Sequence, residues 1–382
     1  MSYDWVITII NKKRESINVL ASLREYLKQQ KDSKRKKQKK IELNKQSKEI
    51  KEIYEYCFRK PLYFDSSLKL LSYIFAKTNE EIEIRQRYID CVKDKSDLYN
   101  KIPIDLLKII TAIKKVKFEN FVVLPRYSFV LKIPFKLAKP YISRDDKEFY
   151  IIDNPIKKDK VFGIPMISAG SWKGNLRWTA GKILENARSS DEKIKIRLKL
   201  VRLFGHENET ERGYFNSLFT NDELSLYERE LEKITTRDGL RRGRLHFYPT
   251  FFFRIGLEVI NPHDRKTKAG KIPIYIECVP EGTCGDFALL YVPFDLMGKP
   301  PEIQKAELIE DLNLIFSSLR DMMLIYGFSA KKSSGFGIIK PEFPEQGKLH
   351  IKGVLKESTF KNFNELKEII KEVSDSSIRE SS

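Results

Sequence analysis

Residues 153–177 read DNPIKKDKVFGIPMISAGSWKGNLR, and this stretch decides how the rest of the chain is interpreted. An aspartate precedes a Pro-Ile-Lys turn, and Gly163 and Pro165 follow it. From Ser171 the apolar residues recur at helical spacing, namely Trp172, Leu176, Ala180, Ile183 and Ala187. The pattern predicts a helix that opens at Ser171.

Small residues surround this expected helix start, namely Ser168, Gly170, Ser171 and Gly174. They allow a close approach to backbone amides, and a helix N-terminus attracts anions. Lys173 and Arg177 add positive charge at the same place. The stretch therefore predicts either a phosphate-binding site or a capped helix whose basic residues are simply exposed.

A second glycine-rich stretch, residues 327–337, reads GFSAKKSSGFG. Its glycines expose amide groups, and Lys331, Lys332 and Ser333 can bind phosphate. It lacks the G-x-x-x-x-G-K-[ST] pattern, which excludes a phosphate-binding loop of the nucleotide-hydrolase type. Gly335-Phe336-Gly337 resembles the core of the RNA-recognition strand, and a turn that ends a helix is the alternative.

The composition indicates a polyanionic partner. Lys and Arg number 71 against 53 Asp and Glu, a net charge of +18, in a 382-residue chain that is 41% hydrophobic. Nucleic acid and an anionic membrane surface both fit such a surplus. No apolar run reaches the ~18 residues of a membrane span, and no secretory signal is evident. Four scattered cysteines (Cys57, Cys91, Cys278 and Cys284) are consistent with reduced thiols, so we expect a cytoplasmic protein without membrane contact.

The distribution of charged, apolar and β-branched residues along the sequence predicts three regions. Residues 1–118 form a small helical domain with a basic loop at 31–40, which either attracts phosphates or is a solvated lysine run. Residues 119–345 mix strands with two helices, an α+β arrangement in which one long helix includes Leu308 to Met323. Residues 346–382 form an extension with a short helix.

The second half of the chain contains expected strands and one irregular stretch that can be interpreted in two ways. Strand-like runs are expected at 243–260, 271–280 and 286–294, whereas 189–242 is charged and irregular. Within the irregular stretch, residues 206–242 form either a β-thumb laid across an RNA duplex or a solvated loop. Four arginines lie in or next to it, namely Arg237, Arg241, Arg242 and Arg244.

The two glycine-rich stretches together resemble the RAMP superfamily, which supplies RNA-binding subunits of CRISPR effector complexes. The family pattern is an aspartate, a Pro-Ile-basic turn, Gly-x-Pro-x-Ile, then Gly-Ser-x-Lys-Gly-x-Leu-Arg, with a glycine-rich loop far downstream. The resemblance covers about residues 120–345 and is closest to type III subunits. Ala169 replaces the usual proline before Gly170, and residues 141–149 lack the family's glycines.

The resemblance implies a modified ferredoxin-like fold of the RNA-recognition-motif type, in a ribonucleoprotein of antiviral defence. Its partners would be guide RNA, target RNA and other CRISPR effector subunits. The implied RNA-binding residues are Ser168, Gly170, Ser171, Lys173, Gly174, Arg177, Arg241, Arg242, Lys331, Lys332, Ser333, Gly335, Phe336 and Gly337.

Asp153 is the candidate catalyst, because backbone subunits that cut target RNA place an aspartate before this turn. Its carboxylate would hold Mg²⁺ or orient a ribose 2′-hydroxyl, with Asp145 and Asp146 as possible helpers. An aspartate before Asn-Pro is also a common turn former, which leaves the endonuclease activity open.

Three alternatives remain. Asn261-Pro262-His263 and the helical N-terminal region resemble RAMP subunits that cap the complex without cutting, although a histidine in such a turn is often structural. A stand-alone, metal-independent guide-processing endoribonuclease shares the glycine-rich loop. A basic scaffold that binds any polyanion through residues 31–40 is the simplest alternative.

Overall fold

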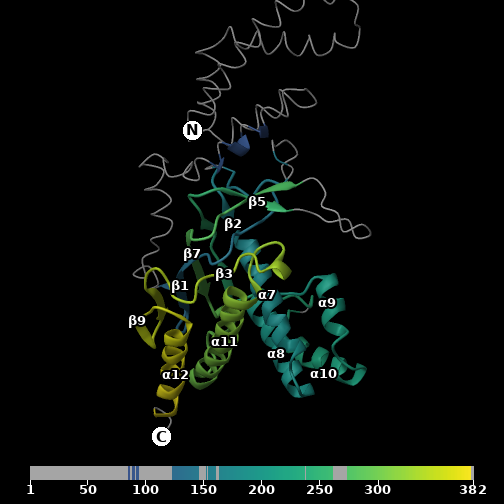
Figure 1. Ribbon diagram of the computed structural model, residues 1–382. Helices are drawn as coiled ribbons and strands as arrows, with labels where there is room; N and C mark the ends of the chain where they lie inside the picture. Colours follow the sequence, from purple (N-terminus) through teal and green to yellow (C-terminus); the bar gives the residue numbers. More distant parts are fainter. Residues whose placement is uncertain are drawn as a thin grey trace, which may run out of the picture. The chain divides into compact units, whose positions relative to one another are not determined.

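The computed structural model describes residues 85–86, 88–90, 92–93, 123–145, 152, 154–160, 163–236, 238–260 and 273–379. The chain divides into two units by its internal contacts. Figure 1 labels the helices and strands named below. The larger unit comprises Lys108–Arg144, Met166–Phe252 and Cys278–Ser382. Among the helices of the described ranges, none combines the length and apolar character needed to cross a membrane.

A five-stranded antiparallel sheet forms the centre of the larger unit, and its strand order is β3-β7-β1-β8-β9. The strands are β1 (Phe129–Lys136), β3 (Leu245–Phe247), β7 (Cys284–Tyr291), β8 (Gly347–Ile351) and β9 (Leu355–Phe360). Two short strands, β2 (Met166–Ile167) and β4 (Thr250–Phe251), pair separately. The predicted α+β class is confirmed.

One face of this sheet is apolar because alternate residues of neighbouring strands are in register. Phe129 lies opposite Tyr291, and their rings stack with centroids 4.7 Å apart. Leu131 lies opposite Leu289 on one side and Leu349 on the other. All five side chains are buried, so this face is the core of the larger unit.

Helices α7 (Ala169–Glu185) and α11 (Pro301–Asp321) cover that apolar face. Trp172 of α7 contacts Phe287 edge to face at 5.0 Å, and Asp311 of α11 accepts a hydrogen bond from the Tyr291 hydroxyl at 2.8 Å. Phe287 and Tyr291 project to the same side of β7 because they are four residues apart on a strand. The predicted long helix is confirmed, and its last turn continues as the π-helical η4 (Met322–Tyr326).

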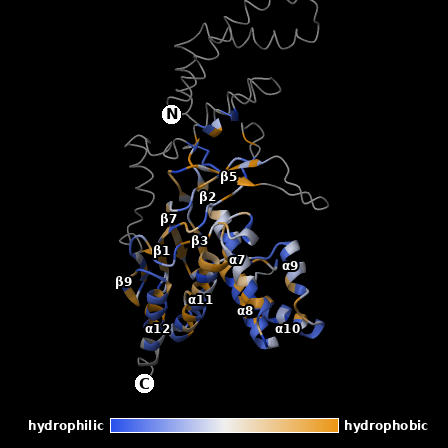
Figure 2. Ribbon diagram, viewed as in Figure 1, coloured by the Kyte–Doolittle hydropathy of each residue, from blue (hydrophilic) through white to orange (hydrophobic). Residues whose placement is uncertain are grey.

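The stretch from 189 to 242 is mainly helical, so the predicted irregular loop or β-thumb is wrong. It contains α8 (Ser190–Phe204), α9 (Glu209–Asn216) and α10 (Asn221–Glu232). Each helix starts with a side-chain cap followed three residues later by an acidic residue, the caps being Ser189, Asn208 and Thr220. Such caps satisfy the free amides of the first turn, which allows short, highly charged helices to form. These helices carry both hydrophilic and hydrophobic residues (Figure 2).

Two other boundaries differ from the sequence-based expectation. Helix α7 begins at Ala169 rather than Ser171, because Ser168 is its N-cap. The sheet continues beyond residue 345, since β8 and β9 belong to it, and α12 (Phe363–Arg379) follows. Phe363 packs edge to face on Phe316 of α11, which connects this last helix to the core.

The expected strand at 243–260 is broken into β3, β4 and β5 (Gly256–Ile260). In the smaller unit, β5 pairs with β6 (Ile274–Cys278). Residues 1–84, including the basic loop at 31–40, lie outside the described residues.

A buried ion network joins β3, β7, α8 and α11. Arg244, which is 2% exposed, donates to Asp311 at 2.8 Å and to Tyr291 at 3.1 Å. Arg202 of α8 donates to the same Asp311 carboxylate at 2.9 Å. Burial opposes ionisation of Asp295, yet hydrogen bonds from Arg244 keep the pKa of that carboxyl below its usual value. Arg244 is therefore a structural cation.

We predict that Arg244→Ala lowers the free energy of unfolding by about 3–5 kcal/mol, because it leaves Asp311 buried with only part of its compensating charge. Arg320→Ala, which removes an exposed ion pair with Asp321, should cost less than about 1 kcal/mol. Urea unfolding followed by circular dichroism measures both losses. Equal losses in the two variants would contradict the assignment.

Candidate nucleic-acid interface

The start of α7 is fixed by its own serines. The Ser168 hydroxyl accepts the Ser171 amide at 3.1 Å and lies 2.8 Å from the Ser171 hydroxyl. The first amides of a helix have no partner within the helix, and the Ser168 cap satisfies only that of Ser171. Positive potential therefore remains at Ala169 and Gly170, as expected for a helix N-terminus.

The glycine-rich loop at 327–337 is a compact turn anchored on the chain that leaves β1. The Ser329 hydroxyl accepts the Ile142 amide at 2.7 Å and donates to the Ile142 carbonyl at 2.8 Å. Gly337 has φ +73°, and a Cβ there would lie 2.4 Å from the Cβ of Ser329. Only glycine fits this position, so the loop conformation depends on it.

The tip of this loop remains accessible. A single 3-10 turn, η5 (Lys332–Ser334), lies between Lys331 and Gly335, both left-handed. Lys331, Ser333 and Ser334 are exposed, and nothing lies within 4 Å of a Cβ position at Gly335. Phe336 lies in a turn rather than a strand, so the comparison with the RNA-recognition strand fails.

The two glycine-rich stretches meet in space although about 150 residues separate them. The Asn175 side chain donates to the Ser171 carbonyl at 2.9 Å and to the Phe328 carbonyl at 3.2 Å. The Lys332 ammonium lies 4.2 Å from the centre of the Trp178 ring. The start of α7 and the glycine-rich loop therefore form one surface.

This surface carries cations that form no close ion pair, although Glu211 acts on Lys173 at longer range. In the ranges that the structure covers, neither Lys173 nor Arg242 makes an ion pair. Burial, followed by the charge of Arg177, lowers the pKa of Lys173. Burial also lowers the pKa of His246, and the positive charges of Arg242 and Lys173 add to the effect. A bound anion would offset these positive charges.

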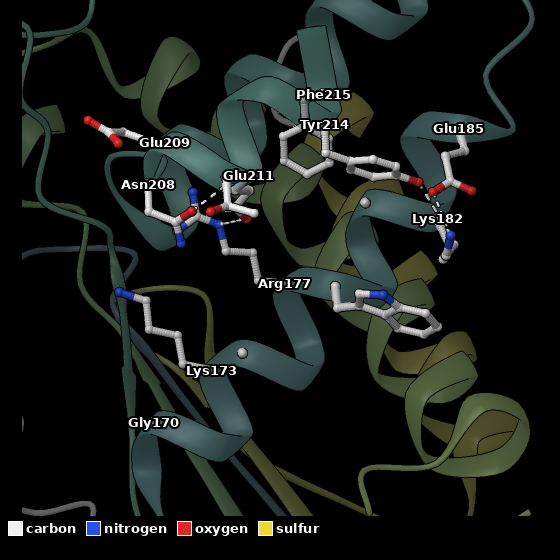
Figure 3. Close-up of a pocket in the computed structure, with 14 residues that line it drawn as sticks. Gly170, Lys173, Arg177, Lys182, Glu185, Asn208, Glu209, Glu211, Tyr214 and Phe215 are labelled. Carbon is white, nitrogen blue, oxygen red and sulfur yellow. Dashed lines mark hydrogen bonds and ion pairs between the residues drawn. The ribbon is translucent and has the colours of Figure 1, made fainter. Parts of the chain in front are cut away.

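A groove of about 860 Å³ runs along α7 and α9 from the same surface. Gly170 and Gly174 lie at one end, and neither has a side chain to fill the space; nothing lies within 4 Å of a Cβ position at Gly174. Figure 3 shows Lys173 and Arg177 projecting from α7, with Arg177 directed toward Glu211. The groove is thus continuous with the half-buried Lys173 at the helix start.

A comparison of the sequence with models of protein families identifies the family of the chain. The sequence matches the RAMP superfamily over residues 68–340. The chain belongs to the RAMP superfamily. The match includes both glycine-rich stretches and the whole of the sheet up to the end of β7, together with α11.

Solved structures show more distant similarity to this RAMP protein. A chain of the "Type III-B Cmr-beta bound to cognate target RNA" is 15% identical, with TM-score 0.40, covering 79% of this chain and 93% of that one. A chain of a "CRISPR RNA-guided surveillance complex" is 14% identical, with TM-score 0.35, covering 58% and 68%. A pre-nicking form gives 10% identity and TM-score 0.32, covering 58% and 77%. No curated protein sequence matches.

The residues predicted from the sequence are not equally accessible in this RAMP protein. Arg177 pairs with Glu211 at 2.5 Å and donates to the His206 carbonyl. Arg241 pairs with Asp295 and donates to a backbone carbonyl, whereas Arg242 is exposed. Two of the arginines are therefore already occupied by partners within the chain.

The candidate catalyst Asp153 lies outside the described residues, as do Asp146, Arg237 and His263. The turn that follows Asp153 is described, however. Buried Glu277 accepts the Ile156 amide at 3.0 Å and the Lys158 ammonium at 2.8 Å, and it also binds the Tyr88 hydroxyl. Across the residues with described positions, no group of three or more His, Cys, Asp or Glu side chains is placed to hold a metal ion.

Sequence reasoning missed Asn175, Trp178 and His246. Asn175 and Trp178 lie within or directly after the stretch that was singled out, and their position on the open side of α7 follows from helical spacing once its start is known. His246 is different, because only the pairing of β3 with β7 places it beside α7.

Proposed function

We propose that the protein is a guide-RNA-binding RAMP subunit of a type III CRISPR ribonucleoprotein, in which it also contacts target RNA and other effector subunits. Family membership supports the proposal. The observation that carries it is the meeting of the α7 start with the glycine-rich loop, next to Lys173 and Arg242, which form no ion pair among the described residues.

The chemistry of this surface suits an RNA backbone. The α7 amides at Ala169 and Gly170 offer donors, and Lys173 and Lys331 offer charge. Gly174 and Gly335 leave space for sugars and phosphates to approach the main chain. None of these contacts reads base identity, so the surface would hold RNA of any sequence.

The connectivity is compatible with the proposed modified ferredoxin-like fold. The order β1-α7-β3-β7-α11-β8 along the chain, with β7 and β8 on either side of β1, has the β-α-β-β-α-β pattern. We place Arg242 among the RNA contacts. Arg241, held by Asp295, orients the segment that presents Arg242.

The RNA-binding proposal predicts a loss of salt-dependent affinity in a Lys173→Gln, Lys331→Gln double variant. Two lost phosphate contacts should reduce the slope of log affinity against log salt by about 1.4 for single-stranded RNA. Fluorescence anisotropy of a labelled RNA, titrated at several salt concentrations, measures this slope.

A double variant of two exposed lysines elsewhere, Lys195→Gln and Lys361→Gln, removes the same charge and should change the slope much less. Equal effects of the two double variants would indicate unspecific attraction of a polyanion, the behaviour of a basic scaffold, and would contradict a built site.

We further propose that Asp153 takes part in cutting guide-matched target RNA. Glu277 and Lys158 hold the turn directly after it, and catalytic groups work best on fixed supports. A divalent ion such as Mg²⁺, if bound, would stabilise charge on the phosphate under attack. The Asp153 carboxylate would bind the ion or orient the 2′-hydroxyl.

We predict that Asp153→Asn slows cutting of guide-matched RNA by at least about 100-fold in the assembled complex with Mg²⁺, while RNA binding persists. Asp159→Asn, in the same segment, is the matched control and should cut normally. Denaturing gels of end-labelled target RNA measure the rate.

Other results of this assay identify the alternatives. Unimpaired cutting by Asp153→Asn would remove the catalytic assignment, and no cutting by the parent would identify a capping subunit. Cutting of isolated repeat RNA in the presence of a chelator would instead identify a guide-processing enzyme.

A further inference from the structure

Trp178 is a large aromatic side chain that the fold leaves on the surface. It follows Arg177 on α7, is 43% exposed and lines the groove between α7 and α9. Trp172, two turns earlier on α7, is fully buried in the core. Trp172 therefore holds α7 against the core, and the packing of α7 does not depend on Trp178.

The Trp178 ring is held in place by its neighbours while part of it stays exposed. Tyr326 of η4 meets it edge to face, with centroids 5.3 Å apart and planes at 89°. The Lys332 ammonium lies 4.2 Å from the ring centre, and the Lys182 ammonium lies 5.2 Å from it. Tyr326 fixes the ring on one side, whereas the two lysine side chains are flexible and can move away. A flat ligand can therefore reach the ring.

The groups next to Trp178 indicate what that ligand is. Lys332 is half-buried, and in the described part of the chain it has no acidic partner, so burial alone lowers its pKa. Lys182 is neutralised by Glu185 at 2.6 Å and points toward Tyr214 across the groove (Figure 3). Lys332 of the glycine-rich loop is therefore the cation next to the ring that is available to bind an anion.

We propose that the indole of Trp178 is a stacking platform for one unpaired nucleobase of bound RNA, and that Lys332 leaves the ring to bind the adjacent phosphate. This rests on the proposed RNA-binding function and assigns a site that phosphate contacts alone do not provide. The ligand is single-stranded RNA that continues from the α7 start, past Gly174, onto Trp178.

Stacking of a base can replace the cation–π contact of Lys332. A cation–π contact contributes about two- to five-fold to an equilibrium constant when exposed and about 30-fold when desolvated, and half-buried Lys332 lies between these limits, whereas stacking of a base on an aromatic ring contributes about five- to 150-fold. The lysine charge is not lost, because the phosphate of the same nucleotide then becomes its partner.

The test uses the full chain and an unstructured 12-nucleotide RNA. Trp178→Ala should weaken binding by about five- to 150-fold, whereas Trp178→Phe should retain most of the affinity. Trp178→Leu keeps the apolar volume without the ring and should bind as weakly as Trp178→Ala. Phe294→Ala removes an exposed aromatic ring elsewhere and should bind as the parent does.

Two further readouts separate stacking from a structural role. A 12-nucleotide RNA that is abasic at every position should bind the parent as weakly as intact RNA binds Trp178→Ala, because the register of the RNA is not fixed, and the two losses should not add. RNA should also quench tryptophan fluorescence in the parent, and this quenching should be absent in Trp178→Phe.

Full affinity of Trp178→Ala, or additive losses, would overturn the platform while the phosphate-binding function remained. A parent that binds no RNA would overturn the proposed function and this inference together. Weak binding by Trp178→Leu with intact thermal stability supports the platform, and full binding by that variant overturns it.

Discussion

Burial of the Trp172 indole is the interaction on which the rest of this structure depends. The ring packs edge to face on Phe135 of β1 and Phe287 of β7 and lies 4.6 Å from Phe328 of the glycine-rich loop. Its N–H donates to Thr250 at 3.1 Å, so the one polar atom of the side chain is satisfied. One residue thus joins the sheet, the helix and the loop. Lys173, the next residue, is thereby presented at the candidate RNA surface.

Much of this arrangement could be predicted from the sequence, because it depends on local patterns. Apolar spacing from Trp172 to Ala180 and from Leu308 to Met323 identified α7 and α11, and the glycines of both stretches marked the places where backbone is accessible. Three helices between 189 and 232 were missed. Helices α9 and α10 bury one side chain each, Phe215 and Tyr227, whereas α8 has a full apolar face from Ile194 to Phe204 within a highly charged stretch. The signals that define them are caps, and capping boxes such as Thr220 with Glu223 are readable in the sequence. The ion network of Arg244 could not be predicted, since Asp311 lies 67 residues away and only the fold brings them together.

The glycines of α7 give a physical reason to expect a ligand at this surface. A glycine inside a helix costs about 0.5–1 kcal/mol relative to alanine, and at Gly174 there is open space for a methyl group. No packing need therefore explains this residue, whereas the proposed close approach of an RNA backbone would explain it. The cations near this surface also fall into two groups. Arg177, Arg241 and Arg244 are engaged within the protein, while Lys173, Arg242 and Lys331 remain for a partner.

Photo-cross-linking reports where RNA lies on the folded chain, and it therefore shows whether the α7 start and the glycine-rich loop bind RNA together. The full protein would be irradiated with RNA that contains 4-thiouridine, digested, and its cross-linked peptides identified by mass spectrometry. The account predicts cross-links in two separate peptides, one containing residues 168–178 and one containing 329–337, both lost in excess unlabelled RNA. Cross-links confined to the exposed faces of α10 and α12, with none in those two peptides, would contradict it.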